Sequence, residues 1–466
     1  MTAATSRPPG AGPASGATRV TEAGGLAGAL RVTGPDEVTA RLTDRSGAPP
    51  GGRPAAVVLA FTVEQVQAVL ADAAARGTPV VTRGAGTGLA GGAVATEGCI
   101  VLDVSGMDAI RQISAEDEVA DVEPGVINAR LDQAAAALGL SYAPDPASAA
   151  ISTIGGNIAT NAGGLHCAKY GVTRESVLGL DVVLADGTLL RTGRRSVKGV
   201  AGYDLTALFV GSEGTLGVIV GATLRLRPRP AATATLAASF DDLAAAARGA
   251  GAITAARVQP AVAELLDRAA LSAVRAAFGD FWGADAGALL LVQTDGLAAG
   301  LEAAAIERAL APLARSVYRA QGAAEADALF AARRQALPAL ERLGQPLIED
   351  IAVPRSQLAR AAEAVAAIGA AHGVPIATIA HAADGNLHPL IVVDGSPGAA
   401  AAAEQAAGEI FALALELGGT VSGEHGVGLL KRRWLERELG PASLALQRQV
   451  KRVFDPAGLL NPGKAL

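Results

Sequence analysis

Arg83-Gly-Ala-Gly-Thr-Gly-Leu-Ala-Gly-Gly92 contains the G-x-G-x-x-G spacing of a dinucleotide-binding turn. In a Rossmann fold, a helix follows this turn at once and directs its N-terminus at a pyrophosphate. Here a strand-like run over residues 99–104 begins too soon after the glycines for such a helix. The segment is therefore interpreted as a loop whose successive backbone N–H groups surround a phosphate, and a plain glycine turn is the alternative.

Two further glycine-rich stretches follow in the same half of the chain. Ser152-Thr-Ile-Gly-Gly-Asn-Ile-Ala-Thr-Asn-Ala-Gly-Gly164 has no hydrophobic periodicity, and we expect its backbone to lie against a large, flat, polar ligand. Gly211-Ser-Glu-Gly-Thr-Leu-Gly217 precedes a strand-like run. Three separated loops of this kind in one domain indicate a ligand longer than a phosphate group.

Composition limits the class of protein. Of the 466 residues, 50% are hydrophobic and 18% are charged, which is typical of a globular protein of about two to three domains. The net charge of −6 arises from interspersed acids and bases, so nothing favours nucleic-acid binding. Cys99 and Cys167 are the only cysteines, too few for a disulfide framework or an iron–sulfur cluster.

The N-terminal sequence and the hydropathy indicate where in the cell the protein is expected. Residues 1–19 are small and rich in proline and glycine, lack the apolar stretch of a secretion signal, and belong to an expected disordered tail over residues 1–25. No window approaches the roughly 20 apolar residues of a membrane span. We therefore expect a cytoplasmic protein, with peripheral association with the inner face of the membrane as the alternative.

Strand and helix signals mix without strict alternation, which favours an α+β fold over a doubly wound sheet. A strand over residues 55–60 precedes a helix that Thr62 and Gln65 cap reciprocally and Gly77 closes. A second strand is expected over residues 79–82.

The first clear break is Pro228-Arg229-Pro230, which separates a first domain from a second. Before it, the dipeptide Asp186-Gly187 predicts a tight hairpin between strands at 179–185 and 188–191. After it, a second α+β domain is predicted from strands at 233–238 and 288–293 and helices at 241–250 and 297–311.

Several ordered motifs from about Pro54 to Lys464 make a family recognisable. The chain resembles the vanillyl-alcohol-oxidase-type flavoproteins and, within them, the D-lactate dehydrogenase and glycolate oxidase flavin-subunit group. The matching stretches are the three glycine-rich loops together with Pro144-Asp-Pro-Ala-Ser148, Lys169-Tyr-Gly-Val-Thr173, Lys198-Gly-Val-Ala-Gly-Tyr-Asp-Leu205, Ser422-Gly-Glu-His-Gly426 and Asn461-Pro-Gly-Lys464.

The resemblance implies that residues 26–229 form a PCMH-type domain that binds FAD across two small α+β subdomains. Residues 230–466 would form an α+β, ferredoxin-like cap over the isoalloxazine, with the last residues returning to the flavin. The first loop would face the pyrophosphate, the second would line the flavin, and Glu213 and Ile219 would lie by the adenine half. By motif position, the cofactor-binding residues are Arg83, Gly84, Ala85, Gly86, Thr87, Gly88, Gly91, Pro144, Ser148, Thr153, Gly156, Asn157, Thr160, Ala162, Glu213, Gly214, Ile219 and Asn461.

Some relatives tether FAD through a histidine in the first loop, and this loop contains none. Non-covalent FAD is therefore expected. His166 and Cys167 lie near the second loop, and we assign them structural roles. Lys169 and Tyr170 either orient the flavin or pack, and the sequence does not decide between these roles.

A histidine pair indicates a metal site in the second domain. In His381-Ala-Ala-Asp-Gly-Asn-Leu-His388, a two-residue turn at Asp384-Gly385 would place the two histidines opposite one another, with Cβ atoms about 4.5–5.5 Å apart. Two imidazoles so placed can chelate one divalent ion, and the alternative is a pair of strand histidines without a metal. These positions match the family's metal ligands. Relatives usually have glycine at the positions of Ala380 and Ala383, which puts the geometry of the site in question.

Glu424 is a plausible third ligand, which leaves coordination positions open for substrate as in catalytic zinc sites. The adjacent His425 is then available as a base. A 2-hydroxy acid chelated by the ion would have an acidified hydroxyl, His425 would take its proton, and the α-hydride would pass to flavin N5. Zinc is the expected ion, although imidazole and carboxylate also suit other divalent metals.

Arg333 matches the family's substrate-facing arginine, and a guanidinium suits a carboxylate; an ordinary surface arginine is the alternative. Relatives acting on dicarboxylic hydroxy acids add a second polar set, whose positions here are Leu337, Ile348 and Leu390. These apolar residues favour a small monocarboxylate, D-lactate or glycolate, over D-2-hydroxyglutarate.

Other functions and partners were weighed against this prediction. A flavin-bearing electron-transfer subunit with a degenerate substrate site is one alternative, and a zinc hydrolase is another, although the latter leaves the glycine-rich loops without a purpose. The electron acceptor, whether a quinone, a cytochrome, a partner iron–sulfur protein or oxygen, has no motif in this chain. Oligomeric state is open, and a homodimer is among the options.

Overall fold

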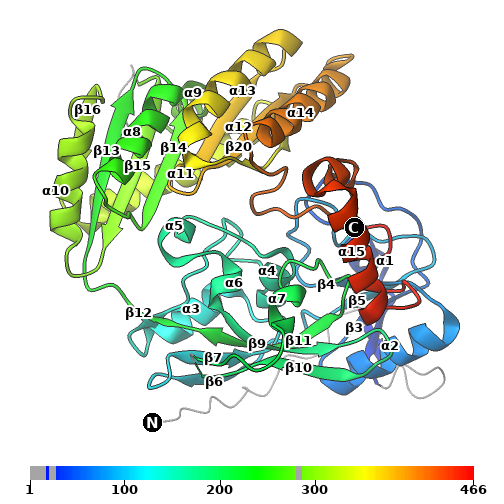
Figure 1. Cartoon of the computed structure of the whole chain (residues 1–466). Helices are drawn as coiled ribbons and strands as arrows, with labels where there is room; N and C mark the ends of the chain where they lie inside the picture. Colours follow the sequence, from blue (N-terminus) through cyan, green and yellow to red (C-terminus); the bar gives the residue numbers. More distant parts are fainter. Residues whose placement is uncertain (1–16, 20–27, 197, 280–285) are drawn as a thin grey trace. The chain divides into compact units, whose positions relative to one another are not determined.

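The computed structural model describes residues 17–19, 28–196, 198–279 and 286–466, which divide into two compact units (Figure 1). The first unit contains Met1–Gly164, Gly171–Arg229 and Glu424–Leu466, and the second contains Leu165–Tyr170 and Pro230–Gly423. The units and the predicted domains share the boundary after Arg229. They differ in two places: Leu165–Tyr170 belongs to the second unit, and Glu424–Leu466 belongs to the first, where Leu460 is fully buried in the core. The predicted tail lies mainly outside the described residues.

The first sheet of the first unit has the order β1-β2-β3-β5-β4, with β3 and β4 both parallel to β5. Helix α2 (Val63–Arg76) connects β3 to β4. As predicted, the Thr62 side chain accepts a hydrogen bond from the Gln65 N–H and Gly77 is the C-cap, whereas the Gln65 side chain accepts from the Phe61 N–H instead of that of Thr62. The strands are β1 (Ala17–Arg19), β2 (Leu30–Val32), β3 (Ala56–Leu59), β4 (Val80–Arg83) and β5 (Ile100–Asp103).

The second sheet of this unit is antiparallel, with the order β10-β9-β11-β7-β6. The predicted hairpin is present, but Leu189 pairs with Val183 and the Leu184 N–H donates to the Thr188 carbonyl, so the loop is longer than two residues. The strands are β6 (Ile110–Ser114), β7 (Val119–Val122), β9 (Val177–Val183), β10 (Leu189–Gly193) and β11 (Val218–Arg225).

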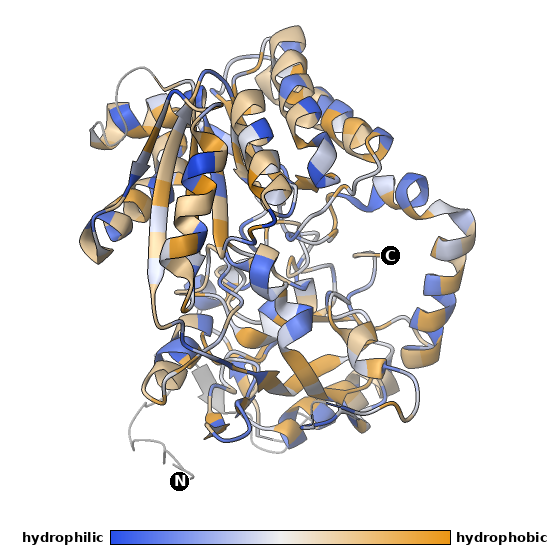
Figure 2. Cartoon of the chain, turned by 60° about the vertical axis from the view of Figure 1, so that its left-hand side comes forward, coloured by the Kyte–Doolittle hydropathy of each residue, from blue (hydrophilic) through white to orange (hydrophobic). Residues whose placement is uncertain are grey.

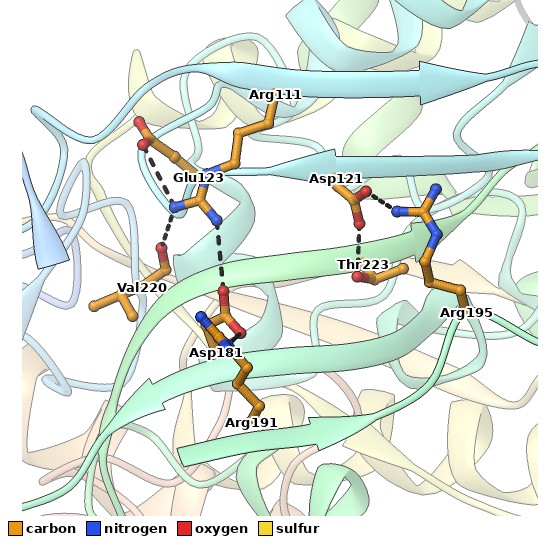
Figure 3. Close-up of polar contacts among 8 residues, drawn as sticks. All are labelled: Arg111, Asp121, Glu123, Asp181, Arg191, Arg195, Val220 and Thr223. Atoms are coloured by element: carbon orange, nitrogen blue, oxygen red, sulfur yellow. Dashed lines mark hydrogen bonds and ion pairs between the residues drawn. The ribbon is translucent and has the colours of Figure 1, made fainter. Parts of the chain in front are cut away.

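Charged side chains form a network over this second sheet (Figure 3). Arg111 lies 3.5 Å from carboxylate oxygens of both Asp181 and Glu123 and donates to the Val220 carbonyl, while Asp121 accepts from Thr223 and pairs with Arg195. Such partly exposed pairs each contribute at most about 1 kcal/mol. The network therefore marks the face of this sheet that is exposed to solvent.

Short elements complete the first unit. A two-stranded sheet pairs β8 with β12, and α15 is kinked at Gly440 and Pro441. The elements are α1 (Pro35–Thr39), α3 (Asn128–Ala136), β8 (Leu140–Ser141), α4 (Ile154–Thr160), α6 (Thr173–Ser176), α7 (Leu205–Phe209), β12 (Arg227–Pro228), the 3-10 helix Arg432–Trp434 and α15 (Leu435–Phe454).

The second unit is an antiparallel sheet with helices on both faces, in the order β16-β13-β15-β14-β19-β20-β17, and β18 also pairs with β20. Its strands are predominantly apolar (Figure 2) because both faces are covered. The strands are β13 (Thr233–Phe240), β14 (Val262–Asp267), β15 (Ala288–Asp295), β16 (Ser316–Arg319), β17 (Gln345–Ile348), β18 (Ile351–Ala352), β19 (Ile376–His381) and β20 (Asn386–Val393).

Two groups of helices cover this sheet. One face packs against α8 (Leu243–Ala255), α10 (Ala299–Leu310), α13 (Leu358–His372) and α14 (Ala399–Glu416). The other packs against α9 (Arg268–Phe278), α11 (Ala323–Arg334) and α12 (Ala336–Glu341). With α5 (Cys167–Tyr170) and the 3-10 helix Arg355–Gln357, these elements confirm the α+β prediction. Within the described part of the chain, no helix has the length and apolar composition required to cross a bilayer.

Because the carboxyl group of Asp267 is buried, we expect the stability of the fold to depend on pH. Its carboxylate caps α9 by accepting from the Ala270 N–H and also accepts from the Thr378 N–H, both at 2.8 Å. Burial raises its pKa from 3.8 to about 6, against the opposing effect of these hydrogen bonds. Between these values the folded state binds more protons than the unfolded state, so the contribution of Asp267 to stability falls as pH rises from about 4 to about 6.

Asp267→Ser keeps an N-cap acceptor without a titrating group. We expect the melting temperature of the parent, relative to this variant, to fall over that pH range. Asp242→Ser, the same change at the exposed N-cap of α8, is the matched control. A difference between parent and Asp267→Ser that does not vary with pH contradicts the prediction.

Candidate active site

The first glycine-rich loop follows β4, in the first unit. Arg83 is 7% exposed and donates to the Thr43 carbonyl, so its guanidinium packs beside the loop. A Cβ added at Gly84 would lie 2.2 Å from the Thr153 Oγ1, and one added at Gly86 would lie 2.0 Å from the Arg83 Nη2. Gly84 is thus required because the segment of Thr153 approaches it too closely for a side chain, whereas the constraint at Gly86 comes from its own φ of +69° and from the neighbouring Arg83.

The second glycine-rich stretch differs from its prediction. It contains the short helix α4, and Ile154 and Ile158, one helical turn apart, are both fully buried in the core. Thr153 caps α4 by accepting from the Gly156 N–H, and Thr160 donates back to the Gly156 carbonyl. The stretch therefore contributes to the core through its two isoleucines, a pattern too short to show as periodicity in the sequence.

The third glycine-rich loop is hydrogen-bonded to the C-terminal segment. The side-chain amide of Asn461 donates to the carbonyls of Glu213 and Gly92, at 2.6 and 3.1 Å. Lys464, 2% exposed, donates to the carbonyls of Gly92 and Val94. Burial lowers the pKa of Lys464 to about 8. The structure thus brings residues from the first and third loops together with Asn461.

The other predicted cofactor residues lie in the same unit. The side-chain amide of Asn128 donates both to the Pro144 carbonyl and to the side chain of Asn157, each at 3.1 Å. Ser148 and Ala162 offer carbonyls to neighbouring backbone, and Ile219 lies in β11. Asn128 was not predicted, because a lone asparagine in a helical stretch carries no distinctive spacing.

The first loop fits the diphosphate part of a dinucleotide. Among the described residues, no acceptor is found for the backbone N–H groups of Gly84–Gly92. Such a series of donors, without side chains to obstruct it, is typical of an anion-binding loop. Gly84–Gly92, Thr153 and Asn157 could therefore hold FAD.

Gly86 offers a direct test of the loop. Its φ is +69°, and alanine there meets both backbone strain of about 1–2 kcal/mol and the Arg83 guanidinium. We expect Gly86→Ala to weaken FAD binding about tenfold or more, since each 1.4 kcal/mol is a factor of ten. The dissociation constant would be measured by titrating deflavinated protein with FAD.

Gly98→Ala is the matched control, because Gly98 has a φ of +67° and nothing within 4 Å of an added Cβ. It should lower stability by about 1–2 kcal/mol and leave FAD affinity within about twofold. Equal FAD affinities for both variants would contradict a cofactor role for the first loop.

His381 and His388 lie on one face of the hairpin of β19 and β20 in the second unit. The predicted register is wrong: His388 pairs with Ile379, because the connection is a four-residue loop in which the Gly385 N–H donates to the His381 carbonyl. Gly385 has a φ of +86°, which suits glycine at this turn. Since the shift is two residues, the histidines stay on one face, with ring centroids 5.1 Å apart.

Glu264, which the sequence analysis missed, lies directly opposite His381 on β14 and is fully buried. Its Oε1 is 2.5 Å from the His381 Nδ1, and its Oε2 accepts from the Nε and Nη2 of Arg333 at 2.9 and 2.6 Å. Burial raises the pKa of Glu264, but the charges and hydrogen bonds of His381 and Arg333 outweigh it and hold the pKa below its usual range. A carboxylate flanked on both sides by apolar residues of the strand was the available signal.

A second buried carboxylate lies beside His388. Asp350, fully buried, has Oδ1 3.8 Å from the His388 Nδ1. Asp350 also accepts from the side chains of Asn386 and Ser422, at 2.7 and 3.1 Å. The contact of Glu264 with the His381 Nδ1 leaves Nε2 of that ring as the candidate ligand atom, whereas the 3.8 Å separation from Asp350 is too long for a hydrogen bond to His388.

Glu424 and His425 belong to the first unit. A Cβ added at Gly163 would lie 2.2 Å from the Glu424 Oε2, so this carboxylate adjoins the second glycine-rich stretch. Glu213 accepts from the N–H groups of Val427 and Gly428, both at 2.8 Å. Glu213, predicted as a cofactor residue, thus holds the turn just after His425.

Lys169 and Tyr170 are anchored within the second unit. Both side chains donate to the carboxylate of Asp295, which is 5% exposed, and the Tyr170 hydroxyl is 2.5 Å from it. His166 packs near Tyr170, with ring centroids 6.3 Å apart, and Cys167 is partly buried. These contacts anchor the side chains of Lys169 and Tyr170 on Asp295.

The donor set of the second unit fits a divalent ion. Ring nitrogens of His381 and His388 lie within 4.8 Å of one another, close enough for both to ligate one ion. Ala380 is fully buried and, by strand alternation, faces away from His381, so its methyl group does not enter the space between the rings. Imidazole nitrogens with carboxylates behind them suit zinc and several other divalent metals.

Two family models match the chain. "FAD binding domain" matches residues 54–193, and "FAD linked oxidases, C-terminal domain" matches residues 229–465. The first match contains the first two glycine-rich stretches, and the second contains the histidine pair, Glu264 and Arg333.

Two curated relatives and one solved structure are similar over most of the chain. Glycolate oxidase subunit GlcD of Bacillus subtilis is 42% identical over 451 residues, covering 93% of this chain and 95% of its own. D-lactate dehydrogenase of Archaeoglobus fulgidus is 37% identical over 415 residues, covering 88% and 91%. p-Cresol methylhydroxylase with substrate bound has a TM-score of 0.75 at 19% identity over 92% of both chains, which shows a shared fold.

Proposed function

Because the chain belongs to the FAD-linked oxidases and is an FAD-linked hydroxy-acid oxidoreductase, we propose that it oxidises a small 2-hydroxy acid, D-lactate or glycolate, to the 2-oxo acid. Non-covalent FAD would supply the hydride acceptor at N5. The alternative substrate is D-2-hydroxyglutarate, which carries a second carboxylate.

Apolar side chains beside the histidine pair support this choice of substrate. Leu390 lies two residues from His388 on the same face of β20 and pairs with Ile348 of β17. Leu337 packs against the same core cluster. A second substrate carboxylate placed against these side chains would lose water without gaining a partner, at a cost of several kcal/mol. A monocarboxylate avoids this cost.

His381, His388 and Glu424 are proposed to hold a divalent ion, which would acidify the substrate hydroxyl when bound. One peptide bond joins Glu424 to Gly423, which packs closely against Asn386 and Asp350 of the second unit. This continuity, together with the family resemblance, supports Glu424 as the third ligand. Zinc is the proposed ion.

Arg333 is proposed to bind the substrate carboxylate. Glu264 occupies its Nε and Nη2, and Nη1 takes no part in that contact. Nη1 can therefore donate to a carboxylate while Glu264 holds the guanidinium in place.

His425 is proposed as the base that removes the hydroxyl proton. Imidazole ordinarily titrates near neutral pH, which suits proton transfer under physiological conditions. The turn after His425 is held by Glu213, whose carboxylate accepts from the backbone N–H groups of Val427 and Gly428.

A partner subunit is proposed to take part in electron transfer from the flavin, because the Bacillus subtilis relative is named as a subunit. A quinone, a cytochrome or an iron–sulfur protein would be the electron acceptor. A flavin-bearing subunit without its own substrate site is the second candidate, and reduction of the isolated protein by a hydroxy acid would exclude it.

The test is the visible spectrum of the purified protein under anaerobic conditions, before and after addition of D-lactate, L-lactate, glycolate and D-2-hydroxyglutarate in turn. We expect D-lactate or glycolate to bleach the oxidised flavin band, and chelator treatment to abolish the bleaching. Bleaching only by D-2-hydroxyglutarate would overturn the choice of a monocarboxylate. A flavin band that no acid reduces would overturn the substrate class.

A further inference from the structure

Glu264 is an unusual residue for its position. It lies within Val262–Asp267, a strand at the centre of the sheet, and it is the only charged residue of that strand with 0% exposure. A buried carboxylate strongly destabilises the folded state unless charged or hydrogen-bonding partners compensate for it. Its presence therefore requires specific partners, and these are His381 and Arg333.

The two oxygens of Glu264 have separate partners. Oε2 accepts both hydrogen bonds from Arg333, and Oε1 lies 2.5 Å from the His381 Nδ1. An ionised carboxylate only accepts, so Nδ1 of His381 carries the hydrogen and Nε2 presents its lone pair. One side chain thus fixes both the tautomer of His381 and the orientation of Arg333.

Asp350 provides an internal comparison. Its oxygens accept from Asn386 and Ser422, and its nearest approach to the His388 Nδ1 is 3.8 Å. The contact between Glu264 and His381 is shorter and includes a cationic side chain, which Asp350 lacks among these contacts. Glu264 is therefore the carboxylate that connects the proposed metal ligands to the proposed substrate arginine.

We propose that Glu264 is a positioning residue that orients His381 for metal binding and Arg333 for the substrate carboxylate. This inference rests on the metal and substrate roles given above to His381 and Arg333. Removing a carboxylate that orients a ligating histidine typically weakens metal affinity about 10–100-fold.

The experiment measures Zn²⁺ affinity by competition with a chromophoric chelator, using metal-stripped protein that retains FAD. Glu264→Gln keeps the shape of the side chain, but its amide group must face a donor of either Arg333 or His381. We expect Zn²⁺ affinity to fall about 10–100-fold, with FAD content unchanged. In the double variant with Arg333→Met, no arginine is left unpaired, and the affinity should stay low because a neutral amide is the weaker acceptor.

Asp295→Asn is the matched control. Asp295 is also a buried carboxylate of the second unit, 5% exposed, and its partners are Lys169 and Tyr170. It should lower the melting temperature and leave Zn²⁺ affinity within about twofold of the parent value, because Asp295 does not contact either histidine.

Each outcome decides the inference. If Glu264→Gln binds Zn²⁺ with the parental affinity, Glu264 has no positioning role. If the affinity falls in Glu264→Gln but returns to the parental value in the double variant, the fall came from an unpaired Arg333, and the positioning role is again overturned. A parent that binds no Zn²⁺ would overturn both this inference and the proposed metal site. A parent that binds Zn²⁺ but is reduced by none of the hydroxy acids would overturn the substrate class alone, and the Zn²⁺ titrations would still decide the role of Glu264.

Discussion

Replacing His388 with alanine is expected to lower the rate of flavin reduction by the hydroxy acid roughly 10³-fold or more. The loss follows from the proposed ion, whose stabilisation of developing negative charge is worth several kcal/mol, and each 1.36 kcal/mol is a factor of ten in rate. The measurement is anaerobic stopped-flow bleaching of the flavin band, with the metal content per polypeptide determined on the same samples.

We also expect His388→Ala to lose the bound metal ion. His388 and His381 contribute two ligands from adjacent strands, so deleting one imidazole leaves an incomplete donor set in the second unit. The proposed FAD-binding residues are in the first unit, and the flavin spectrum of the oxidised variant should therefore be unchanged. A variant with no metal and an intact flavin would separate the two cofactors.

His372→Ala is the control for this variant. It removes an imidazole from the same unit, at the end of α13, where the ring pairs with Glu409 at 3.0 Å. Activity and metal content should match those of the parent. Equal rates for His388→Ala and His372→Ala would show that the histidine pair has no part in the reaction.

Replacing His425 with glutamine is expected to slow flavin reduction by about 10²–10⁴-fold, the usual contribution of a general base. Metal content and FAD content should stay at parental levels, which distinguishes this variant from His388→Ala. The rate would be measured with D-lactate and with D-lactate deuterated at C2, across a range of pH.

The folded structure should tolerate this change. Glu213 binds the backbone N–H groups of Val427 and Gly428, and these two contacts to the turn are kept in the variant. With the base removed, the rise in rate with pH that an imidazole base produces should disappear. A variant that keeps this pH profile and reduces flavin within about threefold of the parent rate would exclude His425 as the base.

Local features were predictable from the sequence. The cap of α2 by Thr62 and its C-cap at Gly77 depend on residues within one or two helical turns, and both are confirmed. The hairpin that carries the histidines was also predictable, because strand-like runs flank Asp384 and Gly385. Its register was wrong by two residues, since turn length depends on how the chain leaves each strand and several lengths suit the same dipeptide.

Features that depend on distant partners were not predictable. Helix α4 was missed because only Ile154 and Ile158 are core residues in it, too few to reveal a period. Glu264 was missed because its partner His381 is 117 residues away, and nothing in a single strand specifies which strand will pair with it. The packing of residues 424–466 into the first unit likewise depends on buried contacts such as that of Leu460.

By itself, the sequence determined that the chain binds FAD, that it has an α+β fold, and which histidines and arginine to consider. These conclusions rest on ordered motifs and on chemistry between near neighbours in the chain. Only the tertiary structure decided that Glu264 holds His381 and Arg333, that Asp350 lies behind His388, and that Glu213 holds the turn after His425. Such pairs form because a common core brings together residues that are far apart in sequence. A charged group buried there is removed from water and must pair with the residues around it.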